Sequence, residues 1–310
     1  VLVEKNIDYL LKKYTFTSFL KMPIGFYQSL RLLKKINPDV VLGFGGYLSI
    51  PVVISSYFLK IPSVIHEQTF GAGVANKILS KFASKVLISW ESSRKFFPFE
   101  KTYLTGNPIK EDIVNAKNNN RADISKKQIY ITGGSTGSHV INVLVEKNIG
   151  YLLKKYSLVH QTGDSKKYND FERLKNIRKN LDSELSEKYK ISKFFNSEES
   201  AKLLISADLI MGRAGINTVT ELLYLEKPAL LIPIPFAQMN EQLKNAQYLN
   251  ESGLGEFLIQ NEITSELFLD RINFMMENIK NYKLKNKINF DNSSKKIVKI
   301  LNDVSKKKTS

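Results

Sequence analysis

Residues able to bind a phosphate group lie in the segment Gln128–Asn142. A β-prone run at 129–131 ends at a glycine pair at 133–134, and the apolar positions of a helix follow. We expect Ser135 or Thr136 to cap that helix. Glycines let a backbone approach an anion closely, and a helix N-terminus directs N–H groups and a positive dipole end at it. The segment predicts a phosphate or diphosphate site, although a plain strand-to-helix turn has the same pattern.

A second loop of this type lies between the apolar run Leu209–Gly212 and a helical pattern that begins near 216. Glu221 lies about one turn into that helix, where a carboxylate can accept hydrogen bonds from both hydroxyls of a ribose. The alternative is that Glu221 only stabilises the helix dipole. Gln242 and Asn245, one helical turn apart, suit the hydroxyls of a sugar.

Composition sets limits on the function. The chain has 310 residues, enough for two domains, and no cysteine, which fits a reducing compartment. No secretory signal or membrane-spanning run is visible, so we expect a cytosolic chain. The net charge of +16 fits a polyphosphate ligand, an anionic membrane surface or a nucleic acid, but also lysine-rich solvated helices. No zinc finger or RNA-recognition signature supports nucleic acid, and no Asp-x-Asp pair predicts a metal site.

Strands alternate with helices along the chain, which predicts two doubly wound parallel sheets in tandem. A polar stretch at Asn115–Lys127 suggests the linker, and we expect domains at 1–118 and 119–310. The expected strands are Val40–Leu42, Ile61–Ile65, Lys85–Ser89, Lys101–Leu104, Gln128–Thr132, Leu158–Gln161, Lys190–Phe195, Leu209–Gly212 and Ala229–Ile234.

The N-terminal segment has two unusual features. Val1–Tyr14 occurs again at Val143–Tyr156 with only Asp8 changed to Gly150, which we interpret as a sequence-level duplication or a damaged N-terminus. Phe16–Phe26 is rich in large apolar residues and has lysines nearby. Such a segment either contacts an anionic bilayer or packs as a helix into its own domain.

Seven motifs in order along the chain resemble those of the MurG family of peptidoglycan glycosyltransferases. They are Gly-Phe-Gly-Gly-Tyr at 43–47, His-Glu-Gln at 66–68, Gly-Asn-Pro at 106–108, Gly-Gly-Ser-x-Gly at 133–137 with Asn142, His-Gln-x-Gly at 160–163, Arg-Ala-Gly…Thr-Val-x-Glu at 213–221, and Gln-x-x-Asn-Ala at 242–246. Together they cover about Phe16–Phe257.

The resemblance implies a GT-B fold, an α/β architecture of two Rossmann-like domains. It implies transfer of N-acetylglucosamine, with inversion, from UDP-N-acetylglucosamine to undecaprenyl-diphospho-N-acetylmuramyl-pentapeptide, without an obligatory metal. The implied donor-binding residues are Lys110, Ser135, Thr136, Gly137, Ile216, Asn217, Thr218, Val219, Thr220, Glu221, Gln242 and Asn245. The implied acceptor-side residues are Gly45, Gly46, Tyr47, His66, Glu67, Gln68 and Thr69.

The resemblance also implies a peripheral protein at the cytoplasmic face of a bacterial membrane, with the lipid-linked acceptor and cell-wall synthesis proteins as partners and no nucleic acid. Lys110 stands where the family usually has a phosphate-binding arginine, and Thr69 where it has asparagine. The family's N-terminal glycine-rich loop ending in histidine has no match here. The catalytic base is therefore unassigned, with Tyr47, Glu67 and Glu221 as candidates, and we expect the chain to bind the donor but transfer it slowly.

Three alternatives stay open on the sequence. One is a GT-B transferase for another lipid, such as diacylglycerol, and one is a UDP-sugar-binding remnant without turnover. The third is a nucleotide-sugar epimerase, which would act without any lipid acceptor.

Overall fold

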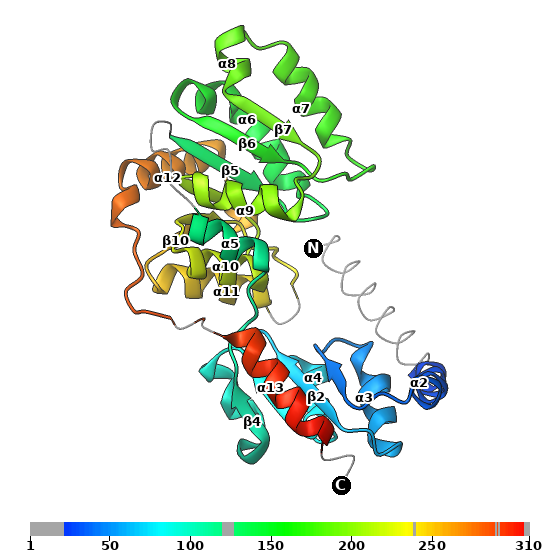
Figure 1. The fold of residues 1–310 in the computed structure, drawn as a ribbon. Helices are drawn as coiled ribbons and strands as arrows, with labels where there is room; N and C mark the ends of the chain where they lie inside the picture. Colours follow the sequence, from blue (N-terminus) through cyan, green and yellow to red (C-terminus); the bar gives the residue numbers. More distant parts are fainter. Residues whose placement is uncertain (1–21, 120–126, 238–239, 289, 291, 307–310) are drawn as a thin grey trace. The chain divides into compact units, whose positions relative to one another are not determined.

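The structure is a computed structural model that describes residues 22–119, 127–237, 240–288, 290 and 292–306 (Figure 1). The first copy of the duplicated 14-residue segment and residues 16–21 of the apolar segment lie outside these ranges. The chain divides into two units. Unit 1 comprises Val1–Pro108 and Asp291–Ser310, and unit 2 comprises Ile109–Phe290.

In the described part of unit 1, four parallel strands form one sheet in the order β1-β2-β3-β4. Helices α3 and α4 pack on one face of this sheet through apolar side chains, and α2 packs against α3. The bounds are α2 Met22–Ile36, β1 Val41–Gly43, α3 Ser49–Phe58, β2 Ser63–Glu67, α4 Val74–Leu79, β3 Lys85–Ile88 and β4 Thr102–Leu104. The short 3-10 helices η1 Glu91–Phe96 and η2 Phe99–Lys101 precede β4.

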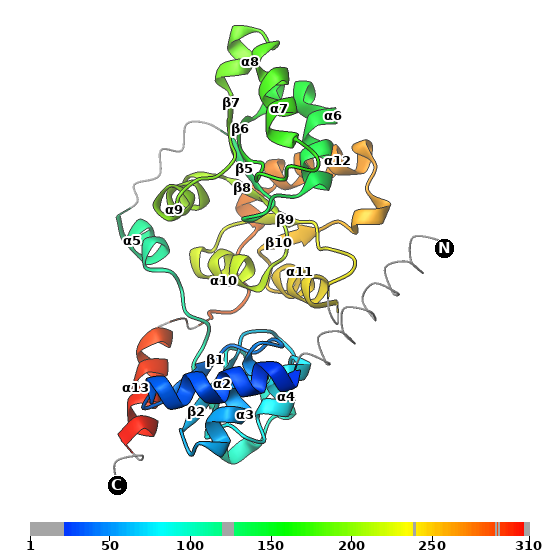
Figure 2. The same cartoon turned by 90° about the vertical axis from the view of Figure 1, so that its right-hand side faces the viewer.

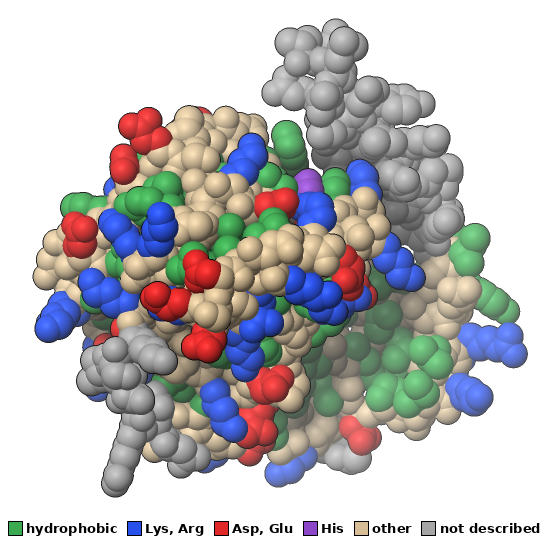
Figure 3. All heavy atoms as spheres, turned by 90° about the horizontal axis from the view of Figure 1, so that it is seen from above, with side chains coloured by type: hydrophobic (Ala, Val, Ile, Leu, Met, Phe, Trp, Pro, Cys, Tyr) green, Lys and Arg blue, Asp and Glu red, His purple; other side chains and the backbone are tan. Residues whose placement is uncertain are grey.

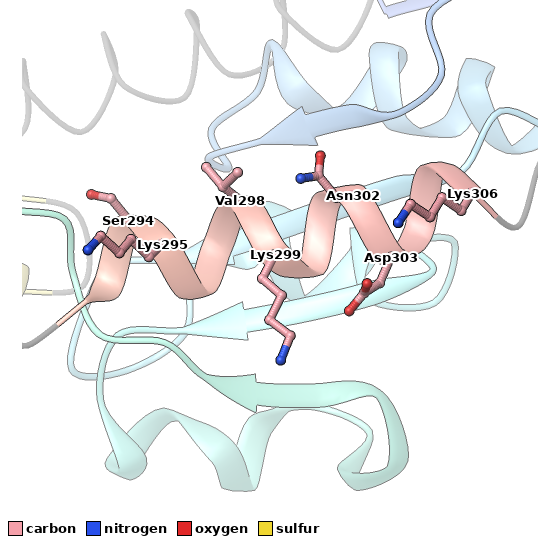
Figure 4. Close-up of a pocket in the computed structure, with 7 residues that line it drawn as sticks. All are labelled: Ser294, Lys295, Val298, Lys299, Asn302, Asp303 and Lys306. Atoms are coloured by element: carbon pink, nitrogen blue, oxygen red, sulfur yellow. The ribbon is translucent and has the colours of Figure 1, made fainter.

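The other face of this sheet is covered by α13, Ser293–Lys306, to which the chain returns after unit 2. Ile297 and Val304 of α13 pack against Val64 and Leu87 of the sheet. The outward side of the helix is mostly polar, with lysines and an aspartate along it and Val298 among them (Figure 4). The amphipathic pattern of α13 therefore closes the core of unit 1.

In the described part of unit 2, six parallel strands form a sheet in the order β10-β9-β8-β5-β6-β7. From β5 the chain builds outward through β6 and β7, and from β8 it builds outward in the opposite direction. The strands are β5 Gln128–Thr132, β6 Ser157–Gln161, β7 Tyr189–Ser192, β8 Leu209–Gly212, β9 Ala229–Leu231 and β10 Gly255–Phe257. The strand order reverses between β5 and β8, where open α/β sheets bind their ligands.

Helices cover both faces of this second sheet because its crossovers run in two directions. The core between the sheet and helices α6 and α12 holds most of the large apolar side chains of unit 2. Helices α9, α10 and α11 lie on the opposite face (Figure 2). The bounds are α5 Glu111–Asn119, α6 His139–Lys155, α7 Asp170–Lys179, α8 Ser183–Glu187, α9 Ser197–Ser206, α10 Ile216–Leu225, α11 Glu241–Glu251 and α12 Ser265–Glu277, with 3-10 helices η4 Gln260–Glu262 and η5 Ile279–Asn281.

The expected domain boundary at 118/119 differs from the observed division. The stretch expected as a linker begins inside α5, which packs on α9 and so belongs to unit 2, and α13 belongs to unit 1. Strand β10 was not expected, because three residues with one glycine give little strand signal. The boundaries differ because α5 packs on α9 and α13 packs on the first sheet.

The glycine loop after β5 is shaped by the neighbouring loop after β6. A Cβ atom on Gly137, whose φ is +75°, would lie 2.0 Å from the carbonyl oxygen of Thr162, and one on Gly163 would lie 2.4 Å from the Gly137 nitrogen. The cap expected at Ser135 or Thr136 is wrong. Ser138 is the N-cap, and its side chain accepts a hydrogen bond from the N–H of Ile141. Both exposed loop residues are thereby left outside the helix.

No helix among the described residues is long and apolar enough to cross a bilayer. On the face shown in Figure 3, basic and acidic side chains are interspersed. The surplus of lysine is therefore not gathered into one uniform surface on that face.

We predict opposite effects for two glycine-to-alanine substitutions in unit 2. Gly137→Ala should destabilise the unit by about 2 kcal/mol or more, because the methyl group has no space and φ is positive. Gly150→Ala should stabilise it by about 0.5–1 kcal/mol, since Gly150 lies inside α6 with open space at its Cβ position. Urea unfolding followed by circular dichroism measures both. Equal effects of the two substitutions would contradict the loop packing.

Candidate functional site

Two βα loops lie side by side at the carboxyl edge of the second sheet. β5 and β8 are hydrogen-bonded neighbours, with Thr132 opposite Gly212 at their last residues. Ser135 and Thr136 are exposed at the tip of the loop that follows β5. After β8, the N-cap of α10 is Gly215, which offers no side-chain acceptor to the N–H groups of the first turn. Helices α6 and α10 therefore begin after adjacent strands, and a helix N-terminus favours an anion such as a diphosphate.

Gln161 holds the first of these loops in place. Its Nε2 donates to the hydroxyl of Thr132 (3.3 Å) and to the carbonyl oxygen of Gly134 (3.2 Å), and its Oε1 accepts from the N–H of Phe195 (3.0 Å). The side chain is 7% exposed. We gave Gln161 no role from the sequence, although the His-Gln-x-Gly motif contains it. It connects three strand ends and fixes the loop without a ligand.

Lys110 and Glu221 form an ion pair, with Nζ 3.0 Å from Oε1. The glutamate side chain is 13% exposed and that of the lysine 63%. The structure thus brings together two residues that the sequence assigned to a phosphate and to a ribose. Glu221 lies in the second turn of α10, near the buried Tyr130 of β5.

The other candidate residues of α10 and α11 divide by burial. Val219 and Thr220 are buried, so their side chains serve packing, whereas Asn217 is exposed and Ile216 and Thr218 are half-buried. On α11 the side-chain amides of Gln242 and Asn245 bind neighbouring loops, a structural role that the sequence pattern does not predict. Asn245 Nδ2 donates to the carbonyl oxygen of Ala214 (2.9 Å), and Gln242 Oε1 accepts from the N–H of Ile234 (3.2 Å).

Arg213 is a cation of this edge to which we assigned no separate role. It follows β8 directly, and Nη1 donates to the carbonyl oxygen of Ile232 (2.9 Å). Burial lowers the pKa of Arg213 to about 10. No carboxylate among the described residues pairs with its guanidinium. A partly desolvated cation at a strand end is suited to an anionic ligand. The sequence signal for such a cation is an arginine directly after an apolar strand.

Two of the three histidines have structural partners in unit 2. The buried His160 lies 3.0 Å from both the Tyr189 hydroxyl and Asn142 Oδ1, and burial lowers its pKa to about 3. Asn142 donates in turn to Asp170 (2.8 Å), which pairs with His139. The asparagine and histidine of these two motifs are buried and join α6, β6 and α7.

The acceptor-side candidates lie at the carboxyl ends of β1 and β2 in unit 1. His66 is buried, and its Nε2 lies 3.2 Å from the carbonyl oxygen of Gly106. Burial lowers the pKa of His66, and its Nδ1 has no hydrogen-bond partner among the described residues. Gly45 and Gly46 have positive φ, and Tyr47 is 54% exposed. With its lowered pKa, the imidazole of His66 is neutral near pH 7, and its unpartnered Nδ1 is buried in the structure.

Glu67, a candidate base, is buried and saturated with hydrogen bonds. It accepts from the N–H (3.0 Å) and hydroxyl (2.7 Å) of Thr69, from the N–H of Gly73 (2.9 Å) and from Asn76 Nδ2 (3.0 Å). Gln68 lies in the same turn, where its carbonyl oxygen accepts from Trp90 Nε1. The geometry makes Glu67 an anchor for the turn that leads into α4.

No group of three histidine, aspartate or glutamate side chains in the described ranges is placed to hold a metal ion.

Glu67→Gln should destabilise unit 1 by about 2 kcal/mol, because the new amide group would face two donors in place of accepting from them. Glu91→Gln is the matched control. Its partner Arg94 is half-buried, but Glu91 itself is 60% exposed, so the loss should stay below about 0.5 kcal/mol. Urea unfolding monitored by the fluorescence of Trp90 reports on this unit. Equal stability of the two variants would contradict the anchoring role.

The low pKa of His160 predicts a pH dependence of stability. The unfolded chain binds a proton near pH 6.5 and the folded chain only near 3, so stability should fall as pH decreases between these values, by up to about 1.4 kcal/mol per pH unit. His160→Gln should lose this component of the slope. Urea unfolding of both proteins between pH 7.5 and 4.5 measures it, and identical slopes would contradict the prediction.

Comparison with known proteins identifies the family. Residues 128–301 match the glycosyltransferase family 28 C-terminal domain and residues 4–88 its N-terminal domain. A relative from Clostridium perfringens (strain SM101 / Type A) is 35% identical over 91% of this chain and 80% of its own length. It is named UDP-N-acetylglucosamine--N-acetylmuramyl-(pentapeptide) pyrophosphoryl-undecaprenol N-acetylglucosamine transferase.

Two solved structures share the fold. Acinetobacter baumannii MurG matches with a TM-score of 0.64 and 25% identity, covering 92% of this chain and 80% of that one. UDP-GlcNAc 2-epimerase from Neisseria meningitidis, bound to UDP-GlcNAc, matches with a TM-score of 0.64 at 16% identity, over 91% and 81%. The prediction of two Rossmann-like domains of the GT-B type is confirmed. The chain belongs to glycosyltransferase family 28 and, within it, to the MurG family.

Proposed function

We propose that this protein transfers N-acetylglucosamine from UDP-N-acetylglucosamine to undecaprenyl-diphospho-N-acetylmuramyl-pentapeptide. The name of the Clostridium perfringens relative supports the donor and the acceptor. The observation that carries the proposal is the edge where β5 and β8 meet. The N-termini of α6 and α10, the half-buried cation Arg213 and the carboxylate of Glu221 all follow these two neighbouring strands.

In this proposal the donor lies across the loops after β5 and β8. The N–H groups at Ser135, Thr136 and the first turn of α10 bind the diphosphate, with Arg213 as the cation. Glu221 accepts hydrogen bonds from the ribose hydroxyls. Gln242 of α11 contacts the sugar.

The proposed reaction is a single displacement with inversion. The 4-hydroxyl of the acceptor sugar loses its proton to a base and attacks the anomeric carbon, while the bond to the diphosphate breaks and UDP leaves. Dipoles and cations that bind the diphosphate stabilise the charge that develops on it. Glu67 accepts four hydrogen bonds and Glu221 pairs with Lys110, so the proposal uses neither carboxylate as the base.

We propose that unit 1 meets the cytoplasmic face of the membrane through α2 and α3. Ile24, Tyr27, Leu32 and Ile36 of α2 are all more than half exposed, as are Tyr57 and Phe58 of α3. Arg31, Lys34 and Lys35 are exposed on α2 among them. Exposed apolar side chains with cations on the same helix are suited to an anionic bilayer surface, and there we would expect the cell-wall synthesis partners.

A transfer assay tests the function. With radiolabelled UDP-N-acetylglucosamine we expect labelled lipid product from the undecaprenyl-linked acceptor, and a drop of at least about tenfold for Glu221→Ala, since a carboxylate hydrogen bond to the substrate is lost. The low rate expected from the sequence stays a prediction that the same assay measures.

Parallel reactions separate the alternatives. Product from diacylglycerol would favour a different lipid transferase, and release of UDP with free sugar in the absence of lipid would favour an epimerase. UDP binding by calorimetry without product from any acceptor would contradict the proposed transfer and favour a binding remnant.

A further inference from the structure

Helix α5 is tied to α10 at both of its ends by a lysine. At its start, Lys110 pairs with Glu221 of α10 at 3.0 Å. Near its end, Lys117 Nζ donates to the carbonyl oxygen of Tyr224 (2.6 Å) and lies over the ring of the same residue, 4.3 Å from the centroid. The opposite side of α5 packs on α9. The helix that begins unit 2 therefore contacts α10, on which the ribose-binding candidate lies, through both lysines.

The backbone of Lys110 is itself fixed. Its carbonyl oxygen accepts from the N–H groups of Ile113 (3.1 Å) and Val114 (3.2 Å), which makes it the residue from which α5 begins. The side chain, though 63% exposed, has its ammonium group on the carboxylate of Glu221, whose side chain is only 13% exposed. An exposed pair of this kind contributes little to stability, and in this structure its lysine contacts the Oε1 side of the less exposed carboxylate.

The carboxylate keeps capacity for a ligand while it is paired. Two carboxylate oxygens offer about four lone-pair directions, and the lysine occupies one of them, on Oε1. Both hydroxyls of a ribose can therefore bind to Glu221 without displacing Lys110. Direct contact of Lys110 with a phosphate would require its ammonium group to leave this partner.

We propose that Lys110 is a positioning residue that acts through Glu221 and determines recognition of the ribose 2′-hydroxyl. It does not act as a phosphate ligand. The inference rests on the proposed donor site and assigns a different role to each of its charged groups. Arg213 and the helix N-termini bind the diphosphate, and the pair of Lys110 with Glu221 reads the sugar of the nucleotide.

Calorimetry with UDP and with 2′-deoxy-UDP tests this. The wild type should bind UDP about tenfold or more tightly than 2′-deoxy-UDP, because a hydrogen bond to a charged group is lost. Lys110→Met should weaken the binding of UDP more than that of 2′-deoxy-UDP, which keeps only the 3′-hydroxyl contact with Glu221, so the ratio should fall to about twofold. Lys110→Arg should restore the ratio, since its cation can keep the carboxylate in place.

Lys117→Met is the matched control, because it removes the other lysine contact between α5 and α10 and should keep the ratio. Equal weakening of both nucleotides by Lys110→Met would overturn the inference and indicate a phosphate contact. Loss of the ratio in Lys117→Met as well would overturn it in favour of general docking of α5. Failure of the wild type to bind either nucleotide would overturn the proposed function, and this inference with it.

Discussion

The parallel pairing of β5 with β8 is the constraint on which the candidate site depends. Each strand is followed by a glycine-containing loop and a helix, and their register places Thr132 opposite Gly212. Two loops remote in sequence therefore open at one edge of the sheet. If β8 paired elsewhere, the glycine loop and the helix that carries Glu221 would belong to separate surfaces, and neither alone would specify a nucleotide.

The protein holds these loops in shape by its own contacts. Gln161 links the glycine loop to β6 and to Phe195, and the loops of Gly137 and Gly163 touch so closely that no side chain fits between them. Donor groups held in place before a ligand arrives cost less to order when it binds. The glycine at position 137 is therefore required for the close packing of the two loops, in addition to any approach of an anion to the backbone.

Much of this arrangement follows from the sequence, and the exceptions have a physical pattern. β5 and β8 begin and end where their apolar runs do, because both faces of a central strand are buried. The cap of α6 is Ser138 and not Ser135 or Thr136, because the loop packs against Gly163, a contact remote in sequence. Strand β10 forms through its pairing with β9, and the division of the units follows from the element on which each helix packs its apolar face. Neither can be seen in a local stretch of sequence. The family resemblance assigns Lys110 to a phosphate, whereas its partner in the structure is Glu221, on a helix more than a hundred residues later.

Hydrogen exchange of the whole chain with and without saturating UDP tests the central claim most directly. The account predicts that UDP slows exchange of the backbone amides at 133–138 and at 215–221 together, while those of α13 in unit 1 are unchanged. Protection of only one of these loops, or protection confined to unit 1, would contradict a nucleotide site built where β5 and β8 meet.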